Sequence, residues 1–263
     1  MQLLCSRDFV LPALRTSVYK EAWNMHHNLL FDLDQTLLDF HASEHLALKA
    51  VMEMNGLVFT EEDYGYFKHI NKNLWLELEK GKISRTELFR SRFKALFDFC
   101  GFDTGKTDLL QINDDFIDRM SHNGILMDGV IGFLEKVTDK ISDAEIYIIT
   151  NGAEKNASGR IASSGLDKYI RKVFVSESMG TSKPSREYFD IVTTTIGDPA
   201  ESYVVIGDSL TSDMLGAKNA GLTSCWFMPE GDIEEAKEEY DIDYTASSFD
   251  ELFEVLLKWS AVG

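Results

Sequence analysis

The residues of this sequence that could do chemistry fall into four short polar clusters. Carboxylates form the first and the last cluster, a hydroxyl and an amide side chain form the second, and a lysine forms the third. In chain order the clusters are Asp32 with Asp34, Thr150 with Asn151, Lys183, and Asp208 with Asp213. A single cluster has an ordinary explanation, because aspartate is a common helix N-cap and Thr-Asn-Gly is a common turn. Four clusters in this order indicate one shared site.

The combination of carboxylates, a hydroxyl group and a lysine suits the transfer of a phosphoryl group. Carboxylates gathered in one place repel one another and take up protons unless a cation lies between them. Oxygen ligands with retained water are the ligands that Mg²⁺ prefers. One carboxylate could attack phosphorus and a second could protonate the leaving oxygen, while the hydroxyl group, backbone N–H groups and the lysine hold the phosphoryl oxygens. The clusters therefore predict a Mg²⁺ cofactor and phosphoryl chemistry.

The clusters follow apolar runs that are typical of buried parallel strands. These runs occupy residues 29–33, 146–149, 173–175 and 203–206, with a weaker fifth run at 223–227. Helical patterns separate them, for instance at residues 130–140, 153–164, 187–196 and 212–220. The alternation predicts an α/β, Rossmann-like fold with a parallel sheet and helices on both faces. Because ligands bind beyond the carboxyl ends of such strands, we expect the clusters to converge.

One interval, residues 41–122, interrupts the alternation because it contains no strand-like run. Its amphipathic patterns predict helices over residues 43–55, 61–79, 84–100 and 108–122. Ser84 to Glu87 supplies a capping box for the third of them. We therefore predict a helical cap domain at 41–122 inserted into a core domain at 27–40 and 123–263. Residues 1–26 precede both and are interpreted as an upstream or expression-derived extension, with a packed helix as the alternative.

The charge balance excludes some classes of partner. Lysine and arginine number 26 and the acidic residues 44, for a net charge of −18. This surplus repels nucleic-acid backbones and anionic membrane surfaces, so we expect neither a nucleic-acid polymer nor a membrane as partner. A small phosphorylated substrate stays compatible, because a local site can oppose the overall sign. The oligomeric state is left open by the sequence.

The cysteines and the apolar runs indicate the compartment. Cys5, Cys100 and Cys225 have no metal-binding spacing, and three thiols cannot all pair. We interpret them as free thiols, which predicts a cytoplasmic location. No apolar run approaches the roughly 20 residues that span a bilayer, and the N-terminal segment does not fit a signal peptide.

The four ordered clusters resemble the four motifs of the haloacid dehalogenase-like (HAD) hydrolase superfamily. The resemblance covers residues 27–40 and about 123–263. It implies that Asp32 is the nucleophile that becomes phosphorylated and that Asp34 is the general acid and base. An acid at position 34 favours a phosphatase over a dehalogenase, since a departing halide needs no proton. Gln35 departs from the pattern, because Gly, Asp or Glu is commoner at that position.

The same resemblance implies the roles of the other clusters. Thr150 and Asn151 would bind the phosphoryl group, and Lys183 would steady both the nucleophile and the phosphate. The predicted Mg²⁺ ligands are the Asp32 carboxylate, the Asp34 backbone carbonyl and the Asp208 carboxylate, with Asp213 orienting the site indirectly or through water.

The predicted cap resembles that of the pyrimidine 5′-nucleotidase (noncanonical pyrimidine nucleotidase) subgroup. The likeness covers roughly residues 59–97 and rests on the segments 71–75, 81–84 and 91–93. A cap of this kind closes over the site and reads the leaving group. A nucleoside needs an aromatic or guanidinium surface for its base. The candidate recognition residues are Trp75, Arg92, Tyr64, Phe67 and His41, with packing or surface charge as the alternative for each.

Together these features predict a Mg²⁺-dependent phosphomonoesterase that acts through an aspartyl phosphate. The favoured hypothesis is a 5′-nucleotidase for pyrimidine nucleoside monophosphates. A HAD phosphatase for sugar or other small organic phosphates is the alternative, because it shares every core residue and differs only in the cap. A phosphomutase and a non-catalytic binding protein are less favoured, the latter because all four motifs are intact.

Overall fold

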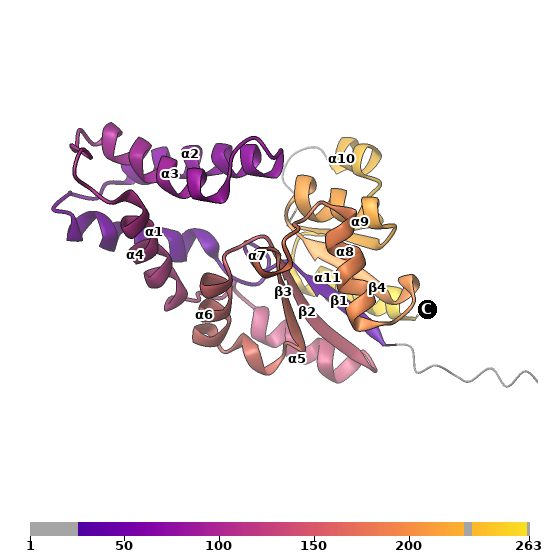
Figure 1. Cartoon of the computed structure of the whole chain (residues 1–263). Helices are drawn as coiled ribbons and strands as arrows, with labels where there is room; N and C mark the ends of the chain where they lie inside the picture. The colour runs from indigo at the N-terminus through magenta and orange to yellow at the C-terminus, as the bar shows by residue number, and fades with distance from the viewer. Residues whose placement is uncertain (1–25, 229–232, 262–263) are drawn as a thin grey trace, which may run out of the picture.

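The computed structural model describes residues 26–228 and 233–261, so the predicted extension lies almost wholly outside the described residues. At the centre of the fold is a six-stranded parallel sheet in the order β3-β2-β1-β4-β5-β6 (Figure 1). The strands are β1 His27–Phe31, β2 Ala144–Thr150, β3 Lys172–Val175, β4 Tyr203–Gly207, β5 Thr223–Phe227 and β6 Tyr244–Ala246. The predicted α/β fold is confirmed. The strand without a prediction, β6, is only three residues long.

The register of the sheet brings the ends of β1, β2 and β4, each of which is followed by a polar cluster, close together. Phe31, the last residue of β1, pairs with Ile148 of β2 and with Ile206 of β4. The clusters that follow β1, β2 and β4 therefore emerge at the same edge. Side chains of β1 point alternately to opposite faces, and both faces are buried, which explains why its sequence is continuously apolar.

Helices cover both faces of the sheet and bury separate apolar clusters. One face packs against α5, α6 and α11, and the other against α8 and α9. These helices are α5 Val130–Lys140, α6 Glu154–Ser164, α8 Arg186–Ile196, α9 Leu215–Ala220 and α11 Phe249–Ser260. Shorter elements complete the core: α7 Ser176–Met179, α10 Ile233–Tyr240, the 3₁₀ turns Leu166–Lys168 and Ala200–Ser202, and the π-helical turn η3 Leu210–Met214. None of the described helices is both long and apolar enough to cross a membrane.

Four helices form an insert between β1 and α5, at the upper left of Figure 1. They are α1 Phe40–Met54, α2 Glu61–Glu79, α3 Arg85–Phe99 and α4 Leu109–Ser121. The insert buries an apolar cluster of its own, which is separate from the clusters on the sheet. The helix limits agree with the four predicted helices to within three residues at each end. The division into a cap and a core domain at residues 41 and 122 stays a prediction.

Two crossover segments, residues 32–39 and 122–129, join the insert to the core and are hydrogen-bonded to each other. Asp39 donates its backbone N–H to the carbonyl of Ile125 at 2.8 Å, and Met127 donates to the carbonyl of Leu37 at 3.0 Å. Ser43 Oγ donates to the carbonyl of Asn123 at 2.7 Å. These bonds hold the insert beyond the carboxyl ends of the strands.

Candidate active site at the carboxyl ends of the strands

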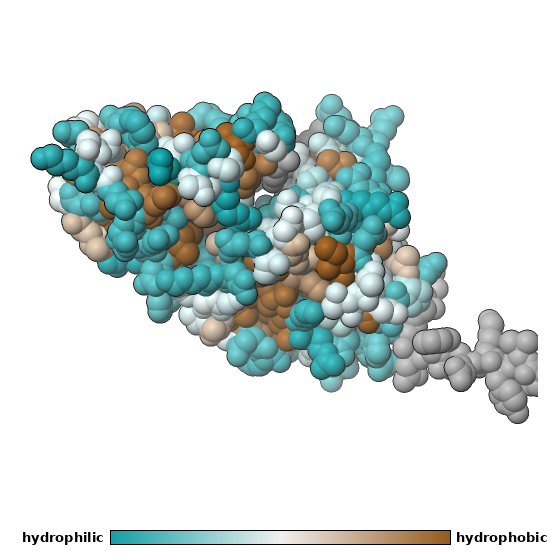
Figure 2. Space-filling view, viewed as in Figure 1, coloured by the Kyte–Doolittle hydropathy of each residue, from teal (hydrophilic) through white to brown (hydrophobic). Residues whose placement is uncertain are grey.

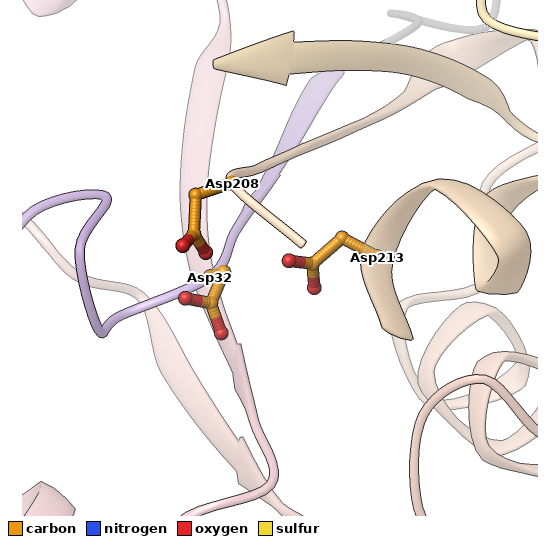
Figure 3. A group of neighbouring side chains, drawn as sticks. All are labelled: Asp32, Asp208 and Asp213. Carbon is orange, nitrogen blue, oxygen red and sulfur yellow. The ribbon is translucent and has the colours of Figure 1, made fainter. Parts of the chain in front are cut away.

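Three aspartates from distant parts of the chain meet at the edge of the sheet. Asp32 follows β1, Asp208 follows β4, and Asp213 lies in η3. One carboxylate oxygen of each lies within 4.8 Å of the others. In Figure 3 the carboxylate of Asp208 lies next to that of Asp32, and Asp213 reaches toward them from its helix. The predicted convergence of the first and fourth clusters is thus present in the structure.

Lys183 lies between two of these carboxylates and is almost completely buried. Its Nζ donates to Asp32 Oδ1 and to Asp213 Oδ1, both at 2.6 Å, and to the carbonyl of Ile149 at 3.0 Å. The second oxygen of Asp213 accepts the backbone N–H of Ser209 at 3.2 Å. Asp213 is therefore engaged with Lys183 and the backbone, which suits an orienting role.

One lysine does not balance three carboxylates in a buried place. Burial, opposed by Lys183 and reinforced by Asp213, raises the pKa of Asp32 well above its ordinary value. Burial and Asp213 raise the pKa of Asp208 to about 7. A divalent cation would favour the ionised carboxylates by supplying the missing positive charge. The donor set is made of hard oxygen atoms, so these residues fit Mg²⁺.

The second cluster is tied directly to the third. The side-chain amide of Asn151 donates to the carbonyl of Lys183 at 2.9 Å and accepts the backbone N–H of Lys183 at 3.0 Å. Thr150, at the end of β2, accepts the N–H of Gly152 through Oγ1 at 3.0 Å. Asn151 therefore holds the segment that carries Lys183, a contact that the sequence did not indicate.

The first cluster ends in a tight loop that turns Asp34 toward the cavity. Leu38 donates its N–H to the carbonyl of Leu33, and Gln35 donates to the carbonyl of Leu38. Gln35 has a φ of 59°, in the left-handed region that glycine adopts most readily. The position where this sequence departs from the family pattern is thus one with a backbone constraint.

A single cavity of about 240 Å³ joins the polar clusters to the helical insert. Its core side is lined by Asp32, Asp34, Thr150, Asn151, Lys183, Asp208 and Asp213. Its insert side is mostly apolar and aromatic, with Phe40, Trp75, Phe89, Arg92, Phe116, Ile117 and Met120. On the face seen in Figure 2 the surface is mostly hydrophilic, with apolar patches over the insert and over the core. The cavity therefore offers polar groups at one end and ring faces at the other.

Two of the five recognition candidates line this cavity. Arg92 is buried in it, and burial lowers the pKa of Arg92 to about 10. Its guanidinium group donates to Asn113 Oδ1 from Nε at 3.1 Å and from Nη2 at 2.5 Å, and to Asn71 Oδ1 from Nη1 at 3.3 Å. The rings of Phe89 and Phe116 lie 5.1 and 4.8 Å from its Cζ atom. Trp75 is the second lining residue.

The other three candidates lie outside the cavity. Phe67 is fully buried in the apolar cluster of the insert, with ring centroids 5.6 Å from Phe93 and 5.8 Å from Phe116. Tyr64 donates its hydroxyl to the carbonyl of His41 at 2.8 Å, and the ring of His41 is exposed. Phe67 and Tyr64 are packed in the insert and His41 lies at its surface, so the structure agrees with the alternative given for each of them.

Two arginines at the site were not identified from the sequence as site residues. Arg85, at the start of α3, donates to the carbonyls of Asn151 and Gly152 at 3.3 Å each and to Ser176 Oγ at 3.2 Å. It thereby connects the insert to the loop after β2. Arg160 lies beside Asp34. Its place on the buried face of a predicted helix was a usable signal, whereas nothing in the spacing marked Arg85.

Comparisons with known proteins agree with this geometry. A family model for haloacid dehalogenase-like hydrolases matches residues 27–221, a range that holds all four clusters. The crystal structure of the HAD-hydrolase YfnB from Bacillus subtilis, bound to magnesium, has a TM-score of 0.78 and 33% identity, covering 88% of this chain and 98% of that one.

Two curated relatives carry the name pyrimidine 5′-nucleotidase. PynA of Streptococcus pneumoniae (strain ATCC BAA-255 / R6) is 36% identical over 202 residues, 76% of this chain and 83% of that protein. YjjG of Escherichia coli (strain K12) is 31% identical over 231 residues, 88% of this chain and 97% of that protein. These matches, with the fold and the ordered clusters, confirm the predicted enzyme class: the chain belongs to the haloacid dehalogenase-like hydrolase family.

Proposed function

We propose that the protein is a Mg²⁺-dependent phosphomonoesterase that removes the 5′-phosphate from pyrimidine nucleoside monophosphates. The observation that carries the proposal is the cavity that joins the carboxylate and lysine cluster to Trp75 and Arg92. One end suits a phosphoryl group, and the other suits a flat base with polar edges. The relatives PynA and YjjG support this class of substrate.

Magnesium is the proposed cofactor. Its ligands would be the carboxylates of Asp32 and Asp208 and the backbone carbonyl of Asp34, with Asp213 orienting the site through Lys183. When bound, Mg²⁺ supplies positive charge that offsets the repulsion between carboxylates and polarises the phosphoryl oxygens. The magnesium-bound structure of YfnB supports this assignment.

In the first step Asp32 acts as the nucleophile and Asp34 as the acid. Lys183 holds Oδ1 of Asp32, which leaves Oδ2 to attack phosphorus. As the new bond to phosphorus forms, the bond to the 5′ oxygen breaks, and Asp34 gives that oxygen its proton. The nucleoside leaves and Asp32 carries the phosphoryl group.

In the second step the carboxyl group of Asp34 acts as a base. Asp34, now ionised, takes a proton from a water molecule whose oxygen attacks phosphorus. The bond to Asp32 breaks, inorganic phosphate forms, and Asp32 is again a free carboxylate. Asp34 keeps the proton that it needs for the next turnover.

The phosphoryl oxygens are held by groups from two clusters. Thr150 Oγ1 and the backbone N–H of Asn151 are the proposed donors from the loop after β2, and Lys183 is the proposed cation. The side chain of Asn151 is occupied by the backbone of Lys183, so it acts by fixing that lysine. Fixed donors of this kind stabilise the charge that moves onto the phosphoryl oxygens in the transition state.

At the other end of the cavity Trp75 and Arg92 are the proposed readers of the base. Arg92 is fixed by Asn71 and Asn113, so its remaining N–H groups have a defined direction. A guanidinium group has donors only, and it therefore suits the carbonyl oxygens of a pyrimidine.

We also propose a reducing, cytoplasmic setting, supported by the free thiols of Cys100 and Cys225.

A panel of phosphate esters tests the proposed function. We expect kcat/KM for UMP, dUMP and dTMP to exceed the values for purine monophosphates and sugar phosphates by about tenfold or more. The Asp32→Asn variant, assayed in parallel, loses the nucleophile and is expected to release no phosphate from any substrate. A lead of sugar phosphates by about tenfold would instead establish the alternative phosphatase. Transfer of phosphate to another position without release would indicate a mutase.

A further inference from the structure

A buried arginine outside the four clusters lies beside the proposed acid. Arg160 is on α6, and its side chain is 0% exposed. Its Nη1 atom lies 2.5 Å from Asp34 Oδ1, and its Cζ atom lies 5.4 Å from the ring centroid of Phe40. Among the described residues, its Nε, Nη1 and Nη2 atoms have no well-aligned hydrogen bond. Asp34 is therefore the ionic partner of this buried charge.

Stability does not explain an arginine at this position. A buried cation whose donors are unsatisfied is costly compared with an apolar side chain of similar volume. The neighbouring buried positions of α6, Ala157 and Ile161, are apolar and pack into the core. Arg160 thus replaces an apolar contact by an ionic contact with one carboxyl group of the active site.

The two carboxylate oxygens of Asp34 have different neighbours. Arg160 lies next to Oδ1, whereas Oδ2 lies on the side of Gly152, 4.0 Å from where a Cβ atom of that residue would be. Gly152 belongs to the loop proposed to hold the phosphoryl group. We propose that Arg160 is a positioning residue that turns Oδ2 of Asp34 toward the leaving oxygen.

The backbone around Arg160 is packed closely enough to make this position rigid. A Cβ atom on Gly159 would lie 2.6 Å from Ser121 Cβ, and one on Gly124 would lie 2.1 Å from the carbonyl oxygen of Arg160. Both glycines therefore permit close packing: Gly159 lets α6 approach the end of α4, and Gly124 lets the second crossover segment approach α6. The Arg160 side chain extends from this closely packed backbone to Phe40, the first residue of α1.

This inference rests on the proposed function, in which Asp34 transfers a proton to the leaving oxygen. That proton moves from Oδ2 to the ester oxygen as the bond from phosphorus to that oxygen breaks and the bond to Asp32 forms. A nucleoside 5′ oxygen is strongly basic and needs the proton, whereas nitrophenolate can leave without it. A misplaced Asp34 should therefore slow the first kind of ester selectively.

The test compares kcat for UMP and for p-nitrophenyl phosphate in the Arg160→Gln variant. We expect kcat for UMP to fall about 100-fold and kcat for p-nitrophenyl phosphate to fall less than about 5-fold, in line with the worth of general acid catalysis. The Asp34→Asn variant should show the same selectivity, and combining both changes should add little. Arg171→Gln, the same change at an exposed arginine, is the matched control and should alter neither rate.

The results distinguish a role of Arg160 in positioning Asp34 from a role in packing alone. An equal loss on both esters, or no loss on either, overturns the proposal. If circular dichroism shows that Arg160→Gln does not fold, Arg160→Lys decides, because it keeps the charge but lacks the planar guanidinium group. A selective loss on UMP in that variant supports the proposal, and an unchanged ratio overturns it. If the wild type does not hydrolyse nucleotides, the nucleotidase proposal fails, and the same comparison is made with ribose 5-phosphate in place of UMP. The role of Arg160 is thus tested independently of the nucleotidase proposal.

Discussion

At the scale of single residues, Lys183 balances only part of the negative charge that the strands bring together. It binds Asp32 and Asp213, while burial raises the pKa of Asp208 from 3.8 to about 7. Between these two pH values the folded protein binds a proton that the unfolded chain has lost. Without metal, the contribution of Asp208 to stability therefore falls as the pH rises from about 4 to about 7.

We expect this dependence to disappear in the metal-free Asp208→Asn variant. Chemical unfolding should give similar midpoints for both proteins near pH 4, and a higher midpoint for the variant near pH 8, as follows from the sign of the pKa shift. Mg²⁺ should stabilise the wild type near pH 8 much more than the variant, because the variant lacks one ligand. Asp250→Asn, at an exposed aspartate, should follow the wild type. Parallel pH curves in wild type and Asp208→Asn would contradict the account.

At the scale of secondary structure, the capping boxes of α2 and α3 make a matched pair. Thr60 with Asp63 begins α2, and Ser84 with Glu87 begins α3. The two boxes have the same hydrogen bonds but different surroundings. Of the two boxes, only that of α3 contains a residue that binds the loop after β2: Arg85 lies between Ser84 and Glu87. The start of α3 should therefore matter to both stability and substrate binding.

We expect Ser84→Ala and Thr60→Ala each to lower the free energy of unfolding by about 1 kcal/mol, the usual contribution of a helix N-cap. Ser84→Ala should also raise KM for the nucleotide several-fold, because a frayed helix start loosens Arg85 from the core. Thr60→Ala should leave KM unchanged. Denaturant titration and steady-state kinetics measure both effects. Equal KM values in the two variants would show that Arg85 does not depend on this cap.

The strands and helices also show which features of the fold could be predicted from the sequence. The central strands and the four helices of the insert were predictable, because buried strands are continuously apolar and amphipathic helices repeat with a known period. The clusters were predictable as neighbours, since parallel strands end at one edge. The pattern does not tell which part of an insert faces the core. Arg92 and Phe67 both occupy buried positions of the insert, yet only Arg92 lines the cavity.

At the scale of the whole molecule, the net charge of −18 is compatible with the proposed phosphate site, because that site has its own positive charges. Lys183, and Mg²⁺ when it is bound, oppose the overall sign at the core end of the cavity. Arg85 joins the insert to the core near this end, and Arg92 lies within the insert. In the proposed function, the chemistry takes place at the core end of the cavity and the insert recognises the substrate.

The most direct test of this division compares UMP with ribose 5-phosphate. The two share the same 5′ leaving oxygen, so their kcat/KM ratio in the presence of Mg²⁺ measures what the base contributes. The account predicts a ratio of about ten or more for the wild type, and a ratio near one for Arg92→Met, which removes the donors proposed to face the base. A wild-type ratio near or below one would contradict the claim that the insert reads a pyrimidine.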